Sequence, residues 1–160
     1  MSVNRVTQVV AGVVDVYMLR PSAGGWQVLT LQRASKARCA GAWETVHGRI
    51  EHDELPEDAA IREVLEETGL GIERLYNVTV QPFYLHHAGC VQMAVVFAGF
   101  VTTGASVKLS DEHQAYEWLP VKTALDRFIW PREVEALGHV VKLLLPAGHA
   151  GPVEDVLRVR

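Results

Sequence analysis

The sequence lacks the features that mark membrane, disulfide-rich or nucleic-acid-coating proteins. No apolar run reaches the length of a membrane span, and the first ten residues lack the long apolar core of a signal peptide. Its two cysteines, Cys39 and Cys90, fit no metal-binding spacing and are too few for a disulfide framework. The net charge of −4 offers no basic field for long nucleic acid. We therefore expect a cytoplasmic protein whose partners include neither a membrane nor long nucleic acid.

The length of 160 residues and the 49% hydrophobic content suit one globular domain with a substantial core. We expect a single domain over 1–160, with its core in about 7–145 and a short C-terminal tail over 146–160. The tail begins with a stretch that contains Gly and Pro, and its sequence does not indicate a function.

Runs of β-branched and aliphatic residues alternate with helical patterns, which predicts an α/β fold. The expected strands are 7–18, 27–32, 43–47, 77–86, 91–101 and 114–118. A helix is expected between Pro56 and Gly69, a brief helical turn near 121–128, and a final helix over 131–145. The apolar stripe of the final helix should face the core; it consists of Val134, Leu137, Val141 and Leu144.

The stretch 48–70 is strongly acidic and holds only one arginine beyond Arg49. On the helix that it predicts, Glu63, Glu66 and Glu67 share one face at i, i+3 and i+4. Three adjacent carboxylates repel one another unless a cation lies among them. Oxygen ligands alone favour a hard cation such as Mg²⁺ or Mn²⁺ over zinc. The alternative is a solvated acidic helix, the more frequent fate of charge runs.

A basic segment precedes the acidic one. Within residues 33–49, the cations Arg33, Lys36, Arg38 and Arg49 are offset only by Glu44. Cations beside an acidic metal site suit a small polyanion whose phosphates contact both. Trp43 could stack on a nucleobase, although a tryptophan in a strand more often packs in the core. We expect substrate contacts from Arg33, Arg38, Trp43 and Gly48.

The acidic stretch resembles the signature of the Nudix hydrolase family, G-x5-E-x7-R-E-U-x-E-E-x-G-U, where U is a bulky aliphatic residue. Every fixed position is filled, by Gly48, Glu54, Arg62, Glu63, Val64, Glu66, Glu67, Gly69 and Leu70. The resemblance implies an α/β/α sandwich with a mixed β-sheet over about 7–145. His47 and Asp53 depart from the glycines that are common beside Gly48 and Glu54, which affects the expected loop shape and substrate.

A second segment, 112–119, is similar to the corresponding part of the dATP and dihydroneopterin triphosphate pyrophosphohydrolases, as is the segment around Trp130. This likeness implies that Glu112 reaches the metal site from a loop, whereas the residues alone favour a solvated carboxylate. It also implies a nucleoside triphosphate substrate, hydrolysed to a nucleoside monophosphate and pyrophosphate.

The family resemblance implies a Mg²⁺ cofactor, for which Mn²⁺ can substitute, and a catalytic set of carboxylates. The metal ligands would be Glu63, Glu66, Glu67 and Glu112. Arg62 should pair with Glu66, and Glu54 should orient the loop or the ligands. The general base is either Glu67 or Glu112. Other Nudix substrates (dinucleoside polyphosphates, nucleotide sugars, capped RNA ends) and a catalytically silent nucleotide sensor stay open, as does a homodimer.

Overall fold

A computed structural model describes residues 6–160; the first five residues of the predicted domain lie outside the described residues. The strands are β1 Gln8–Ser22, β2 Gly25–Arg33, β3 Trp43–Glu44, β4 Val46–Arg49, β5 Arg74–Leu85, β6 Cys90–Phe100 and β7 His113–Pro120. The helices are α1 Pro56–Thr68, α2 Val121–Arg127, α3 Pro131–Leu144, the 3₁₀ turn η1 Gly151–Val153, and α4 Glu154–Leu157. Across the described residues, no helix is long and apolar enough to cross a membrane.

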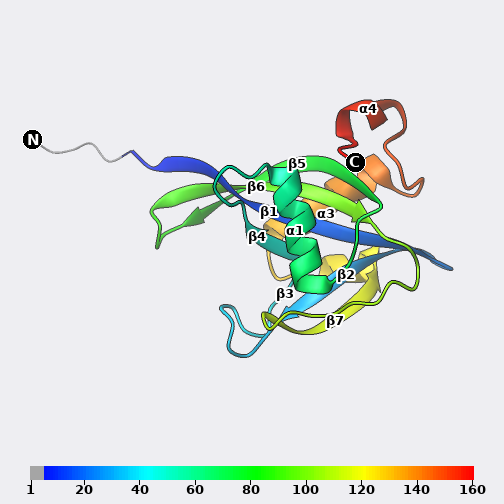
Figure 1. Cartoon of the computed structure of the whole chain (residues 1–160), viewed down its shortest axis with the longest axis horizontal. Coiled ribbons are helices and arrows are strands. Elements are labelled where there is room, and N and C mark those ends of the chain that lie inside the picture. Colours follow the sequence, from blue (N-terminus) through cyan, green and yellow to red (C-terminus); the bar gives the residue numbers. More distant parts are fainter. Residues whose placement is uncertain (1–5) are drawn as a thin grey trace, which may run out of the picture.

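The seven strands form one mixed sheet around β1 (Figure 1). The order is β3-β2-β1-β6-β5, with β4 also paired to β1 and β7 to β2. β1 runs parallel to β6, and its other pairings, with β2 and β4, are antiparallel. A strand with neighbours on both edges and layers on both faces should be apolar throughout, and residues 13–19 of β1 are all buried.

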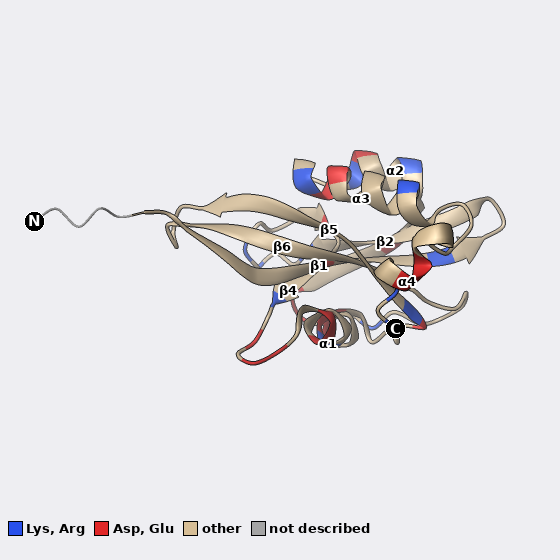
Figure 2. Ribbon diagram, turned by 90° about the horizontal axis from the view of Figure 1, so that it is seen from above, with Lys and Arg blue, Asp and Glu red and all other residues tan. Residues whose placement is uncertain are grey.

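Helices cover both faces of the sheet, so the fold is an α/β/α sandwich, as predicted. Figure 2 shows α1 on one face and α2 with α3 on the other. Alternation along β1 supplies both cores: Val14 and Val16 pack in the cluster with Val64 of α1, whereas Tyr17 packs with Leu137 of α3. The sheet thereby fixes α1 and α3 on opposite sides of β1.

The predicted strand over 43–47 is in fact two strands, because Thr45 interrupts it. β3 pairs with β2, and β4 pairs with β1. Between them the Thr45 backbone N–H donates to Glu133, and its hydroxyl donates to the Val16 carbonyl. These two bonds replace ladder bonds where the chain passes from one partner strand to the next.

The predicted core stripe of α3 is partly right. Leu137 and Leu144 are buried, whereas Val134 and Val141 are only half-buried. The helix is rotated so that Val140 and the carboxylic side chain of Glu133 also face inward. A hydrophobicity pattern does not anticipate a buried glutamate; its Oε1 atom accepts from the Thr45 N–H, whereas its Oε2 atom is buried without a partner among the described residues.

The tail over 146–160 is ordered and packs along the outer strand β5. The Trp26 indole N–H donates to the Pro146 carbonyl, and the Tyr76 hydroxyl donates to Glu154. At its end, Val159 N–H donates to the Leu75 carbonyl, and Arg160 pairs with Asp58 in the first turn of α1. The tail therefore contacts both the sheet and the helix that carries the acidic signature.

Candidate active site

The acidic helix α1 has the limits that its sequence predicts. Pro56 occupies its first turn, and Gly69 ends it in the left-handed region at φ 68° with its N–H bonded to the Leu65 carbonyl. The predicted acidic face is not uniform, however: Glu67 is buried, Glu63 is half-buried and Glu66 is exposed. α1 thus presents Glu63 and Glu67 toward the sheet and Glu66 toward solvent.

Gly48 of β4 allows Glu63 to lie against the sheet. A Cβ atom at position 48 would fall 1.9 Å from the Glu63 Cδ atom, so the Glu63 side chain would have to move away from its position. The glycine that the signature requires therefore makes room for a carboxylate, and its own φ is not in the left-handed region.

Gly48→Ala should therefore displace the Glu63 carboxylate, destabilise the fold by about 1–3 kcal/mol and sharply reduce activity. Denaturant unfolding and initial rates measure the two effects. Gly138→Ala in α3, where an added Cβ meets nothing within 4 Å, is the matched control; it should leave activity unchanged and stabilise the fold by about 0.5–1 kcal/mol, because Ala favours a helix interior over Gly. An active, fully stable Gly48→Ala protein would contradict the assigned role of Gly48.

Arg62 fixes the acidic loop and helix relative to each other. Its guanidinium donates to both oxygens of Glu54, at 2.8 and 2.9 Å, to Glu63 at 2.8 Å, and to the Arg49 carbonyl at 2.8 Å. The predicted pair with Glu66 is present but longer, at 3.3 Å. Hydrogen bonds from Arg62 and from the Glu51 N–H lower the pKa of Glu54 to about 2. Glu54 therefore orients the loop as a permanently ionised carboxylate.

Glu67 is the most perturbed carboxyl group of the signature. Burial, together with the charges of Glu63, Glu112 and Glu44, raises its pKa to about 9. It accepts a hydrogen bond from the His47 backbone, yet its Oε2 atom is buried without a partner. A buried carboxyl oxygen with no donor and several acidic neighbours is suited to binding a cation.

The raised pKa of Glu67 predicts how the stability of the metal-free protein depends on pH. The unfolded chain releases this proton near pH 4.5, whereas the folded protein keeps it up to about pH 9. Since the folded state binds more protons in that window, stability should fall by about 1 kcal/mol per pH unit as pH rises. Denaturant unfolding in chelator from pH 5 to 9 measures this slope. Burial also raises the pKa of Glu133, which contributes to the slope in both proteins, so Glu67→Gln should reduce the slope without removing it. Equal slopes in both proteins would contradict the assignment.

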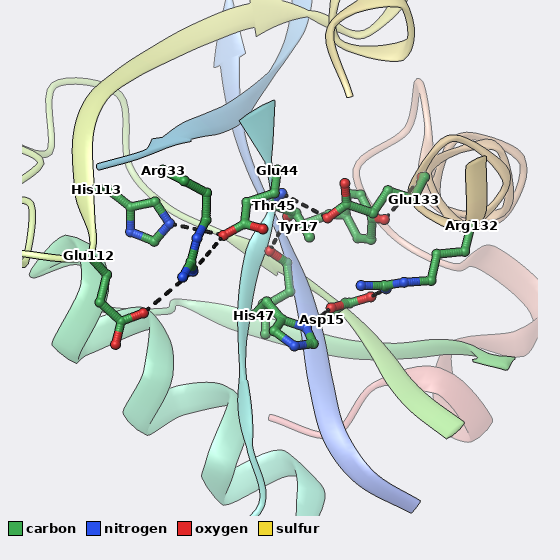
Figure 3. Close-up of polar contacts among 11 residues, drawn as sticks. Asp15, Tyr17, Arg33, Glu44, Thr45, His47, Glu112, His113, Arg132 and Glu133 are labelled. Atoms are coloured by element: carbon green, nitrogen blue, oxygen red, sulfur yellow. Dashed lines mark hydrogen bonds and ion pairs between the residues drawn. The ribbon is translucent and has the colours of Figure 1, made fainter. Parts of the chain in front are cut away.

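A second group of charges holds Glu112 near α1 (Figure 3). Arg33 bonds Glu44 at 3.1 Å and lies 3.6 Å from Glu112, whose side chain is 61% exposed. Glu44 also accepts from the buried His113 at 3.2 Å. The sequence pattern did not identify Glu44 and His113, because neither belongs to the signature. Their burial beside Arg33 connects β3, β2 and the start of β7.

The four expected metal ligands do not form a closed cage. Among residues 6–160, no three His, Cys, Asp or Glu side chains are arranged closely enough to hold a metal ion. Glu63 and Glu66 are turned to Arg62, and Glu112 to Arg33, since carboxylates move toward cations and away from one another. The orphaned Oε2 of Glu67 and the acidic groups that raise its pKa still fit a divalent cation.

A cleft of roughly 490 Å³ lies next to this acidic group. It is lined by apolar and aromatic side chains, among them Phe83, Leu85 and Trp130, and by several arginines and histidines. The residues that complete it are Arg33, Arg38, Cys39, Glu44, His47, Pro82, Tyr84, His86, His87, Pro131 and Arg132. A cleft of this size and lining is typical of small-molecule sites, and a nucleoside would fit against its aromatic residues.

The expected substrate contacts divide between the cleft and its surroundings. Arg33 and Arg38 line the cleft, and Arg33 Nε donates to the Arg38 carbonyl. Trp43 does not line it: the Arg127 guanidinium lies 4.5 Å from the centre of its ring. Gly48 lies under Glu63. In this structure the aromatic residues that face the cleft are Phe83, Tyr84 and Trp130.

A buried ion network connects the cleft wall to the centre of the sheet, and the sequence pattern gave no sign of it. Asp15 of β1 is fully buried and accepts from His47 Nδ1 at 2.6 Å and from Arg132. Burial alone would raise the pKa of Asp15, but His47 and Arg132 hold it below its ordinary value. The Arg132 guanidinium also lies 4.5 Å from the centre of the Phe83 ring. The partners are far apart in sequence, so only the fold brings them together.

The sequence of this chain is similar to a known family and to known proteins. The model of the NUDIX domain matches residues 9–140. The CTP pyrophosphohydrolase of Escherichia coli (strain K12) is 31% identical over 113 residues, which cover 69% of this chain and 79% of that protein. An octanoyltransferase of Myxococcus xanthus is 40% identical over 89 residues, 54% of this chain. That match spans only 25% of the Myxococcus protein, so it concerns one part of a longer chain.

Solved structures agree on the fold. A Caenorhabditis elegans Ap4A hydrolase in a binary complex superposes with a TM-score of 0.74 at 22% identity, covering 84% of this chain and 98% of that one. The dihydroneopterin triphosphate pyrophosphohydrolase of E. coli superposes with a TM-score of 0.66 at 21% identity, covering 86% and 99%. At these identities the likeness establishes the architecture and leaves the substrate open.

Proposed function

Since this chain belongs to the Nudix family, we propose that it hydrolyses a nucleoside triphosphate, of the dNTP or NTP type, to a nucleoside monophosphate and pyrophosphate. The proposal takes Mg²⁺ as the cofactor, with Mn²⁺ able to replace it. The residues proposed to hold the cation are Glu63, Glu66, Glu67 and Glu112.

One observation carries this proposal: the buried, unpartnered Glu67 Oε2 lies beside a cleft that combines aromatic walls with arginines. Glu67 and the cleft are adjacent because the His47 backbone bonds Glu67 while its ring lines the cleft. A triphosphate joins an aromatic base to a polyanion, so it matches both parts. The C. elegans and E. coli neighbours act on related phosphate anhydrides by their names.

The proposal assigns a separate role in the reaction to each group of residues. A bound divalent cation supplies charge neutralisation and an acidified water. Arg62 and Glu54 hold the loop and helix in register, and Gly48 leaves space for Glu63. Arg33 and Arg38 bind phosphate oxygens at the cleft. Either Glu67 or Glu112 removes the proton from the attacking water.

The substrate is tested by a pyrophosphate-release assay with Mg²⁺ on a panel of nucleotides. The panel includes dATP, CTP and the remaining common triphosphates, because the E. coli relative is named for CTP. Ap4A and a nucleotide sugar represent the other Nudix activities. Release of pyrophosphate and a monophosphate from one or more triphosphates is expected. Turnover of Ap4A alone would replace the proposed substrate class, and binding without any turnover would indicate a sensor.

Glu112→Gln distinguishes a participating carboxylate from a solvated one. Arg33 already holds Glu112 near the site, and Glu112 contributes to the raised pKa of Glu67. If Glu112 is the general base, the substitution should lower turnover by about 10²-fold or more. As a ligand it should instead raise the Mg²⁺ concentration for half-maximal rate. Glu135→Gln, at an exposed position on α3, is the control. An unchanged rate and an unchanged metal titration in Glu112→Gln would show that Glu112 is a solvated carboxylate without a part in the reaction.

A further inference from the structure

Asp15 lies at a position where a carboxylate is costly. It is in the middle of β1, with β4 and β6 on its two edges and no exposed surface. A buried charge of this kind persists only when it is paired and hydrogen-bonded. Both of its oxygens are used: Oδ1 by His47, which lies directly opposite in the β1–β4 register, and Oδ2 by Arg132 of α3.

Both partners of Asp15 line the cleft, so the carboxylate determines how they face it. Because His47 uses Nδ1 for Asp15, its remaining ring atom for a ligand is Nε2, and no residue among 6–160 bonds that atom. The His47 side chain is 28% exposed. Arg132 uses one terminal nitrogen for Asp15 and stacks on Phe83, which leaves other N–H groups available. The pair therefore presents oriented polar groups to the cleft.

The position of His47 along the cleft indicates what it meets. Its backbone N–H bonds Glu67, and the next residue, Gly48, lies under Glu63. On its other side, its ring is 6.5 Å from that of Phe83. His47 therefore lies between an aromatic residue of the cleft and the acidic helix, so a nucleotide whose base contacts Phe83 and whose distal phosphates reach a cation at Glu67 would bring the phosphate attached to the nucleoside near His47.

We propose that His47, oriented by Asp15 and supported by Arg132, binds the phosphate group that is bonded to the nucleoside in its doubly protonated form, in which Nδ1–H donates to Asp15 and Nε2–H donates to a phosphate oxygen. His47 is then a substrate-binding residue, and Asp15 is a positioning residue that acts through it. The inference rests on the proposed function, because it requires a nucleotide in the cleft. It assigns a role to a histidine at a position where the family commonly has glycine.

The test measures by calorimetry the binding of three ligands that represent different parts of the substrate. They are the nucleoside of the best substrate, its monophosphate, and inorganic pyrophosphate. In His47→Asn the amide can replace Nδ1 toward Asp15, but nothing replaces Nε2. This variant should bind the monophosphate about tenfold more weakly and raise KM, with unchanged binding of the nucleoside and of pyrophosphate. His47→Gln, whose amide reaches the Nε2 position, should recover part of the loss. His139→Asn, an exposed change on α3, is the control.

Asp15→Asn keeps the shape of the side chain that bonds His47 and Arg132 but removes its charge. It should therefore weaken binding of the monophosphate as His47→Asn does. If it fails to fold, His47→Asn decides the question alone. Equal weakening of nucleoside and monophosphate binding would assign His47 to the base or sugar and overturn the inference. Unchanged binding of all three in an active variant would overturn it while leaving the proposed function intact. A wild-type protein that neither binds the monophosphate nor hydrolyses any nucleotide would overturn both.

Discussion

Glu67→Gln should abolish most of the turnover, by about 10²-fold or more, in a protein that remains folded. Gln has nearly the helix propensity of Glu, and at this buried position it is neutral, as the protonated Glu67 is in the metal-free folded state below about pH 9. Catalysis should be lost while the free energy of unfolding at pH 8 rises. At that pH the wild-type chain must take up a proton at Glu67 when it folds, and the glutamine variant need not.

Initial rates, circular dichroism and denaturant unfolding on the same sample test this expectation. Glu57→Gln, in the first turn of the same helix, is the control for a charge removed from α1 without loss of a proposed ligand. A folded Glu67→Gln protein with wild-type turnover would show that Glu67 is neither ligand nor base.

Removal of divalent metal should abolish activity entirely, and Mg²⁺ or Mn²⁺ added singly should restore it. The acidic group consists of oxygen ligands, which favour hard cations, and no cysteine or histidine belongs to it. Since Glu67 retains its proton up to about pH 9 without metal, binding near pH 7.5 should release a proton. Calorimetry in buffers of different ionisation enthalpy measures that release.

Three results would contradict the metal prediction. Full activity in chelator would exclude a divalent cation from the reaction. Mg²⁺ binding to the wild type with no proton release, or with the same release in Glu67→Gln, would place the cation away from Glu67. Restoration by Zn²⁺ alone would contradict the expected preference for a hard cation.

Sequence patterns predicted most of the secondary structure because its signals are local. The limits of α1 depend on Pro56 and Gly69, and the hairpin expected from 77–86 and 91–101 is observed as β5 and β6. The break at Thr45 was missed, since it depends on a bond to Glu133, which is 88 residues away. The order of the strands likewise follows from long-range pairing, above all the parallel pair of β1 and β6.

The candidate site was predictable where it coincides with the signature and unpredictable where it depends on tertiary contacts. Helical spacing predicted that Glu63 and Glu67 share one face with Glu66. That Glu67 is buried while Glu66 is exposed depends on how α1 lies on the sheet. Asp15 gave no sign in an otherwise apolar strand. Its partner Arg132 is 117 residues away, so only the folded chain reveals the pair. Glu44 and His113 were missed for the same reason.

The ordered tail has a consequence for the native-state fluctuations of the site. Leu75 N–H bonds the Arg160 carbonyl, Val159 N–H bonds the Leu75 carbonyl, and the Arg160 side chain holds Asp58 of α1. One opening event that releases the tail therefore frees two amides and loosens the first turn of α1 together. Hydrogen exchange at Leu75 and Val159 should share one opening free energy. The tail thereby connects the exchange of amides in β5 to the first turn of the helix that carries Glu67.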